Sequence, residues 1–133
     1  QTMSRLLVSS GSPYEKSVGY SRAVRVGNWI SVAGTTAASG GKPVAVGDPE
    51  AQTRAIFETI DKALQDAGSS LRDVVRTTVY LVDIKHFDAM AQVHGEVFAD
   101  IRPANTTLEV SGFVSPDWLV EIAVDAVVPE ASE

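Results

Sequence analysis

The sequence contains no cysteine. This absence excludes disulfides, thiol nucleophiles and thiolate metal sites, and it is compatible with a reducing compartment. Long apolar runs are also missing: none approaches the roughly 20 residues that a membrane-spanning helix needs. The N-terminus does not show the basic, apolar and small-residue regions of a secretory signal. We therefore expect a cytoplasmic protein without a membrane partner.

Basic residues are few and scattered. The chain has 11 Lys and Arg against 17 Asp and Glu, a net charge of −6 and a pI of about 4.8. Nucleic acids and anionic membranes bind basic surfaces, so neither is expected as a partner. Histidine is scarce as well, since only His86 and His94 occur, eight residues apart and outside any HExxH motif. Without a third ligand at a suitable spacing, we expect no metal site.

The 133 residues, of which 44% are hydrophobic, suffice for one core and hence for a single domain over 1–133. Residue periodicity predicts the order β-β-β-α-β-α-β-β. The expected strands cover residues 5–9, 20–26, 29–33, 75–82, 105–110 and 119–128, and the expected helices cover 48–68 and 83–100. Residues 10–17 and 37–47 are expected to be loops.

Several local signals fix the expected boundaries. Asp48 followed by Pro49 is typical of a capped helix start, and Gly68 of a left-handed helix end. Gly27-Asn28 predicts a two-residue hairpin turn. Gly34 closes the next strand at a point where a side chain cannot be fitted or where the backbone must approach something closely.

The last expected strand, residues 119–128, carries carboxylates among apolar residues. Period-two geometry places Val120 and Ile122 on one face and Glu121 and Asp125 on the other. A carboxylate in such surroundings is costly unless it is paired, solvated or used. Either both acids face solvent or pair with arginines, or one of them handles a water or a proton in a partly desolvated cleft.

The preceding strand places Asn105 and Thr107 on one face, so polar side chains are expected to converge in this C-terminal region. Arg102, just before Pro103, can hold a surface acid or reach an anionic ligand. His94 lies on the apolar stripe of the second helix, where it is either a core or interface histidine or part of a pocket.

Two helices suffice to cover one face of the expected sheet, yet the strand at 119–128 is apolar on both faces. A second buried sheet face without a covering layer implies another copy of the chain. We therefore expect a homo-oligomer whose sheets pack together. The alternative is a monomer with an exposed, partly polar sheet face.

Taken together, several short motifs in this order resemble the RidA/YjgF family of reactive-intermediate deaminases, over about residues 19–128. They are Gly19-Tyr20, Val26-Gly27-Asn28, Ala33-Gly34, Ala67-Gly68, the run DVVRTTVY at 73–80, Arg102-Pro103-Ala104, Glu109-Val110 and Val120-Glu121-Ile122. The resemblance implies an α+β, chorismate-mutase-like fold with a mixed β-sheet and two helices on one face. It also implies a homotrimeric barrel, three substrate clefts between subunits and no cofactor.

The resemblance assigns roles to particular positions. Glu121 matches the acid that positions the attacking water, Tyr20 matches a pocket tyrosine, and Gly34 matches a glycine that lets the ligand approach the backbone. His94 falls where the family often has a tyrosine. Asn105 stands where the family's deaminases bind the substrate carboxylate through an arginine.

The change at position 105 affects the expected substrate. Asparagine lacks the charge and the bidentate fork of arginine, so a standard 2-imino acid is not expected as the substrate. Arg102 could compensate if Pro103 breaks the strand alternation. We expect a hydrolase of an imine, an enamine or a related labile metabolite, with Asn105 and Thr107 holding its polar end. The alternative is a non-catalytic small-molecule-binding trimer. A ribonuclease role is disfavoured by the acidic charge.

Overall fold

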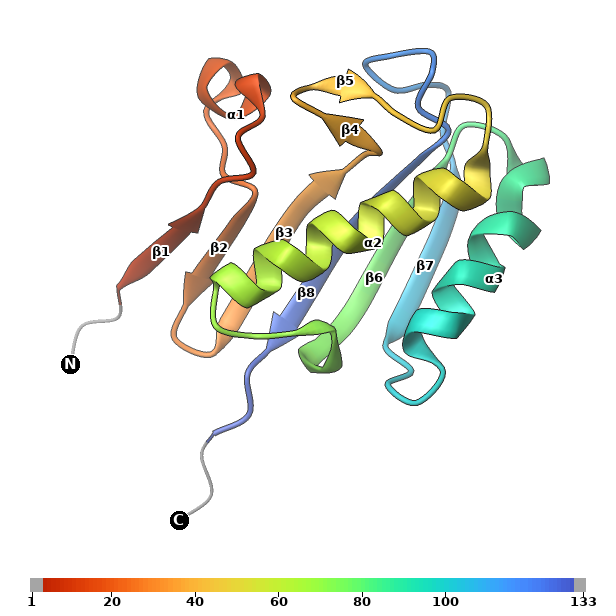
Figure 1. Ribbon diagram of the computed structural model, residues 1–133. Helices are drawn as coiled ribbons and strands as arrows, with labels where there is room; N and C mark the ends of the chain where they lie inside the picture. Colours follow the sequence, from red (N-terminus) through yellow and green to blue (C-terminus); the bar gives the residue numbers. More distant parts are fainter. Residues whose placement is uncertain (1–3, 131–133) are drawn as a thin grey trace.

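The computed structural model describes residues 4–130 and forms one sheet covered on one side by two helices (Figure 1). The sheet consists of β1 (Arg5–Val8), β2 (Ala23–Val26), β3 (Trp29–Thr35), β6 (Val74–Leu81), β7 (Ala104–Glu109) and β8 (Val120–Val127). The helices are α1 (Pro13–Val18), α2 (Pro49–Asp66) and α3 (Phe87–Phe98), with 3-10 turns η1 (Leu71–Asp73) and η2 (Ile84–His86). A small hairpin pairs β4 (Ala38–Ser39) with β5 (Lys42–Pro43).

The strand order β1-β2-β3-β8-β6-β7 makes the sheet mixed. Strands β6 and β7 are parallel and are connected through α3, whereas all other neighbours are antiparallel. The last strand, β8, inserts between β3 and β6, so it lies in the centre of the sheet. The predicted α+β class with a mixed sheet and two covering helices is confirmed.

The predicted start and end of α2 are correct. The Asp48 side chain accepts a hydrogen bond of 3.0 Å from the Ala51 N–H, and Pro49 occupies the first turn. Gly68 has a φ of 83°, in the left-handed region, directly after the cap residue Ala67. The predicted Gly27-Asn28 turn is also present, because it joins β2 to β3.

Two predicted loops contain regular structure. Residues 13–18 form α1, whose Ser12 cap accepts from the Tyr14 N–H and whose end is marked by Gly19 at a φ of 89°. This helix of six residues is too short to show an apolar period, although Ser12-Pro13 is a start signal like that of α2. Residues 37–47 contain the β4–β5 hairpin. Asp83 caps the short turn η2 and not α3 itself.

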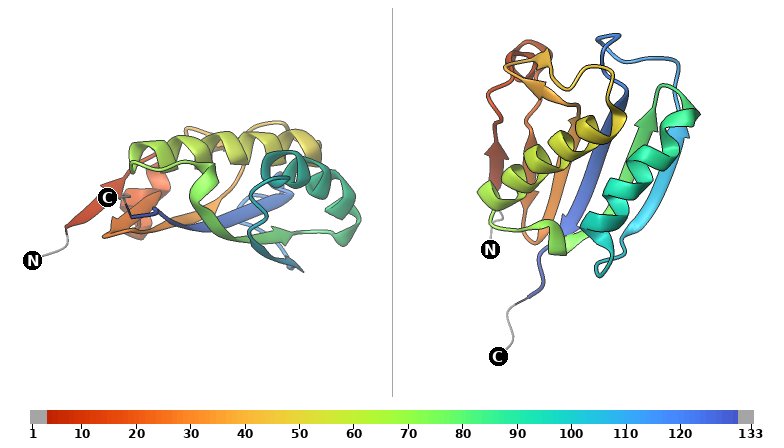
Figure 2. Two further views of the ribbon diagram at one scale, coloured as in Figure 1. Left: turned by 90° about the horizontal axis from the view of Figure 1, so that it is seen from below. Right: turned by 45° about the vertical axis from the view of Figure 1, so that its right-hand side comes forward.

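The core lies between the sheet and the two long helices. Figure 2 shows from below that both helices lie on the same side of the sheet. In β8 the buried residues Val120, Ile122 and Val124 alternate with half-buried ones, as the sequence pattern predicts. They belong to the same core cluster as Ile56 and Ile60 of α2. Glu121 and Asp125 therefore point to the opposite face of the sheet.

That opposite face, called the open face below, is not covered by any element of residues 4–130. It presents four large apolar side chains: Leu7, Trp29, Leu108 and Val127, with exposed fractions of 58%, 50%, 49% and 36%. Their strand register places them on the same side as Asp125 and Tyr80. None of the helices in the described part of the chain combines the length and apolarity of a membrane-spanning helix.

Candidate functional site

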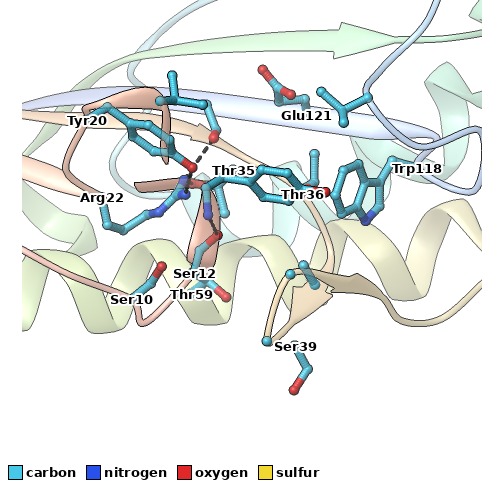
Figure 3. Close-up of a pocket in the computed structure, with 17 residues that line it drawn as sticks. Ser10, Ser12, Tyr20, Arg22, Thr35, Thr36, Ser39, Thr59, Trp118 and Glu121 are labelled. Atoms are coloured by element: carbon cyan, nitrogen blue, oxygen red, sulfur yellow. Dashed lines mark hydrogen bonds between the residues drawn. The ribbon is translucent and has the colours of Figure 1, made fainter. Parts of the chain in front are cut away.

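A cavity of about 380 Å³ opens where the ends of β2, β3 and β8 meet α1 and the β4–β5 hairpin (Figure 3). Its walls are rich in hydroxyl groups, which come from Ser10, Ser12, Tyr14, Tyr20, Thr35, Thr36, Ser39 and Thr59. Of the residues that line it, only Arg22 and Glu121 carry charged side chains. A small polar molecule would therefore meet one cation, one acid and many hydrogen-bonding groups.

The Glu121 carboxyl is half-buried at one side of this cavity. Burial raises its pKa above the ordinary value, and the positive charge of Arg22 acts in the opposite direction. Desolvation of this kind makes a carboxyl a better proton acceptor when it is ionised, because its conjugate acid is more stable. A carboxyl with a raised pKa in a small cavity is a candidate general base and acid.

Gly34 of β3 faces Glu121 across the strand pair. A Cβ added at Gly34 would overlap Oε2 of Glu121 and would lie 3.0 Å from its Cδ. The pairing of β3 with β8 is irregular between Val32 and Thr35, where the strand presents Gly34 to the carboxylate. The missing side chain thus makes room for the acid, which is a physical reason for the glycine predicted at this strand end.

We expect Gly34→Ala to displace the Glu121 carboxylate without unfolding the chain, since the end of a glutamate side chain can rotate away. Displacement of the carboxylate should lower the rate of the hydrolysis expected from the sequence by about 10- to 100-fold. The measurement is the turnover rate beside the melting temperature. Gly95→Ala is the matched control, because a Cβ at Gly95 in α3 meets nothing within 4 Å. Equal rates for the two variants would contradict the assignment.

Arg22, which the sequence prediction missed, links residues of the cavity wall by hydrogen bonds. Its Nη1 donates to the Gly34 carbonyl at 2.8 Å and to Thr35 Oγ1 at 3.0 Å, and its Nη2 donates to the Tyr20 hydroxyl at 3.0 Å. Only 6% of Arg22 is exposed. Its Nε lies 3.9 Å from Oε2 of Glu15, too far for a hydrogen bond. Arg22 therefore holds the predicted site residues Tyr20 and Gly34 in place beside Glu121.

The segment before β8 is braced by two buried side chains that the sequence did not single out. The Trp118 indole N–H donates to the Ala37 carbonyl at 2.8 Å. The Gln52 amide of α2 donates to the Asp117 carbonyl at 2.8 Å and accepts from the Leu119 N–H at 2.9 Å. The two Gln52 bonds hold the backbone at Asp117 and Leu119, shortly before Glu121 in the chain.

Three other predicted residues form a second group, the edge network, at β7 and α3. Asn105 Nδ2 donates to Thr77 Oγ1 at 3.0 Å, and the Thr107 hydroxyl donates to Asn105 Oδ1 at 3.0 Å. Nε2 of His94 lies 2.9 Å from the same Thr77 oxygen. Thr77 is fully buried and was not predicted as a site residue.

The His94 ring packs edge-on against Phe57 and tilted against Phe98, at centroid distances of 6.0 and 4.8 Å. Burial lowers the pKa of His94, so the ring is kept in its neutral form over a wider pH range. The packing of the ring agrees with the core interpretation of this histidine, and its role in a pocket stays a prediction. Among residues 4–130, no three acidic or histidine side chains are grouped so that they could hold a metal ion.

The side chains of Asn105 and Glu121 point to opposite faces of the sheet. Asn105 is in register with Thr77 on the helix-covered face, whereas Glu121 faces the open side, and β6 separates their strands. The expectation that polar side chains of the two C-terminal strands converge is therefore wrong within a single chain. Arg102 belongs to neither group: it lies in the turn before β7 with a φ of 56°, and its side chain makes no hydrogen bond or ion pair within residues 4–130.

Comparison with known proteins shows the family to which the chain belongs. The family model described as Endoribonuclease L-PSP matches residues 12–128. An uncharacterized protein of Streptomyces coelicolor, SCO2049, is 41% identical over 119 residues, which cover 90% of this chain and 89% of that protein. The 3-aminoacrylate deaminase RutC of Acinetobacter baylyi is 46% identical over 80 residues, 60% of this chain and 63% of that enzyme.

Solved structures match over nearly the whole chain. Rv2704 from Mycobacterium tuberculosis, a member of the YjgF/YER057c/UK114 family, has a TM-score of 0.86 and 46% identity, covering 94% of this chain and all of that one. A putative endoribonuclease of Thermotoga maritima has a TM-score of 0.79 and 29% identity, covering 93% of both chains. The resemblance found in the sequence is thus confirmed, and the chain belongs to the Endoribonuclease L-PSP family, the family of YjgF and RidA.

Proposed function

We propose that the protein is a deaminase that hydrolyses an imine, an enamine or a related labile small metabolite, with the attacking water positioned by Glu121. The observation that carries the proposal is the half-buried Glu121 carboxyl, whose pKa is raised by burial, facing Gly34 in a hydroxyl-lined cavity. The similarity to a 3-aminoacrylate deaminase supports the same class of reaction, because 3-aminoacrylate is an enamine.

The chemistry needs one proton-handling group and correct positioning. Ionised Glu121 takes a proton from water while the water oxygen attacks the carbon of the C=N bond, which gives a carbinolamine. Because the reacting imine is protonated, this carbinolamine is neutral. Glu121 then passes the proton to the nitrogen and accepts the proton of the carbinolamine hydroxyl as the C–N bond breaks. A carbonyl product and ammonia leave, and the ammonia takes the remaining proton from Glu121 as ammonium. Tyr20 would hydrogen-bond the substrate within the cavity. A protonated imine is already a good electrophile, so no cofactor is required.

The edge network would supply the binding group for the polar end of the substrate. Asn105, Thr107 and His94 lie on the other sheet face from Glu121, so both groups can reach one substrate only if a second copy contributes one of them. We therefore propose a homotrimer with clefts between subunits, in which the open faces pack together. The exposed Leu7, Trp29, Leu108 and Val127 support this packing, because water-exposed apolar patches of this kind mark interfaces.

Leu108→Lys is expected to break the oligomer into smaller species, since it puts a charge on the open face in place of one of its exposed apolar side chains. The mass in solution, measured by size-exclusion chromatography with light scattering, should fall. Val46→Lys is the control, because Val46 is 61% exposed but lies in the loop before α2. A native mass for Leu108→Lys would contradict the role of this face, and loss of activity together with loss of mass would support a shared site.

The direct test of the proposed function is the release of ammonia from imines generated in situ. We expect the protein to accelerate it, with slow turnover of 2-iminopropionate and 2-iminobutyrate and faster turnover of imines without a carboxylate, because Asn105 offers no positive charge. If no imine or enamine is hydrolysed faster than in buffer, the non-catalytic ligand-binding trimer becomes the better explanation.

The family's description as an endoribonuclease suggests RNA as another substrate. The net charge of −6 weighs against it, because RNA binding relies on basic surfaces that neutralise phosphates. A salt-sensitive complex with RNA at low micromolar concentration would reverse this judgement.

A further inference from the structure

The hydrogen bonds of the edge network run in one direction. Thr77 Oγ1 accepts from Asn105 Nδ2, so the only proton of the Thr77 hydroxyl is available for Nε2 of His94. Among residues 4–130 this buried hydroxyl has no other acceptor within hydrogen-bond distance, so its proton is satisfied only when Nε2 is the unprotonated nitrogen and the ring proton sits on Nδ1. The lowered pKa of His94 is consistent with this neutral acceptor form. The fully buried Thr77 hydroxyl is thereby satisfied on both sides.

The same bonds determine which hydrogen-bonding groups of Asn105 remain free for a ligand. A carboxamide has two N–H donors and an oxygen with two lone pairs. One N–H of Asn105 is used by Thr77, and one lone pair is used by the Thr107 hydroxyl. One donor and one acceptor remain, both uncharged, on a side chain that is exposed at the edge strand.

We infer that Asn105 recognises an uncharged amide-type group of the substrate, such as a carboxamide, a lactam or a ureido group, and discriminates against a free carboxylate. An amide carries both an acceptor and a donor, which match the two remaining groups of Asn105. A carboxylate carries acceptors only, so it would leave the Asn105 oxygen facing negative charge and would lose hydration without a cationic partner. This inference rests on the proposed function, because it takes Asn105 to be a substrate-binding group.

Thr77 and His94 are positioning residues in this arrangement. Neither needs to touch the substrate, because they act by fixing the rotation of the Asn105 amide. Without Thr77 Oγ1 the amide is held only by the Thr107 hydroxyl, and it can turn its nitrogen and oxygen to suit either type of ligand. The preference for an amide over a carboxylate should therefore depend on Thr77.

The experiment uses stable ketones in place of imines, which hydrolyse in water. Pyruvamide and pyruvate differ only in the group that Asn105 would bind, a carboxamide in the first and a carboxylate in the second. Their binding to the protein is followed by NMR on the side-chain NH₂ signals of Asn105 and the ring nitrogens of His94. Thr77→Val removes the hydroxyl at nearly constant volume. Thr78→Val is the matched control, because Thr78 is the next residue on β6 and faces the other side.

For the wild type we expect the neutral Nδ1–H form of His94, a shift of the Asn105 signals with pyruvamide, and pyruvamide binding at least ten times tighter than pyruvate. Thr77→Val should lose most of this preference, and Thr78→Val should keep it. Pyruvate binding as tightly as pyruvamide in the wild type would overturn the inference, as would unmoved Asn105 signals with both ligands or a full preference in a folded Thr77→Val. Absence of turnover with every imine would instead refute the proposed deaminase, because the binding preference requires no reaction.

Discussion

Replacing Glu121 by glutamine should lower kcat for imine hydrolysis by about 10²–10⁴-fold, the usual contribution of a general base. Glutamine keeps the length and shape of the side chain, so the contact with Gly34 and the cavity walls stays the same. It cannot accept a proton from water, however. The rate of ammonia release at saturating substrate measures the effect, and a loss in kcat with little change in KM is expected because the group acts in the transition state.

Asp125→Asn is the matched control for this variant. Asp125 lies on the same strand and the same face as Glu121, and its Oδ1 accepts a hydrogen bond of 2.9 Å from Ser31. It does not line the cavity. Similar activities for Glu121→Gln and the wild type would show that Glu121 is not the base, and an equal loss in Asp125→Asn would point to a general effect of charge on the open face.

The raised pKa of Glu121 also determines how the effect of Glu121→Gln on stability depends on pH. A folded-state pKa above the ordinary value of 4.5 means that folding favours the protonated acid. The stabilisation is fully present below the unfolded-state pKa and is lost as the pH rises through the folded-state pKa. Glutamine stays neutral throughout. The melting temperature of Glu121→Gln relative to the wild type should therefore be higher at pH 8 than at pH 4.

The elements that could be predicted are those whose signals are local. The alternation of β8 fixed which residues face the helices, and Asp48-Pro49 fixed the start of α2. The helix α1 was missed because six residues carry no measurable period. The open apolar face was expected from the same alternation, since Glu121 shares its side of β8 with Ala123 and Val127.

The site was only partly predictable because its contacts connect distant segments. Glu121, Gly34 and Tyr20 were expected and do line one cavity. Arg22 could not be distinguished from other scattered basic residues, since its partners Gly34 and Thr35 are reached only through strand pairing. The strand order, with β6 between β8 and β7, was equally invisible in the sequence, and it is this order that separates Asn105 from Glu121.

Asn105→Arg is expected to shift the substrate preference of the protein toward 2-imino acids. A guanidinium grips a carboxylate through two charge-assisted hydrogen bonds, which the present carboxamide cannot supply. Charged pairs in partly desolvated clefts are worth about 2–5 kcal/mol, so kcat/KM for 2-iminopropionate should rise by ~30-fold to several thousand-fold. Asn105→Lys, which adds the charge without the fork, should give a smaller gain. Ammonia release from 2-iminopropionate measures all three proteins.

The substitution must also preserve the edge network. Thr77 is fully buried and at present receives the Asn105 N–H, so the new side chain has to replace that donor. Arginine has five N–H groups, so it can donate both to Thr77 and to a carboxylate. A lower melting temperature of Asn105→Arg would show that the arginine does not replace the hydrogen bond to Thr77. If position 105 reads the polar end of the substrate, the same variant should bind pyruvate more tightly than pyruvamide. Rapid turnover of 2-iminopropionate by the wild type would instead require another cation to hold the carboxylate, with Arg102 as the first to be replaced.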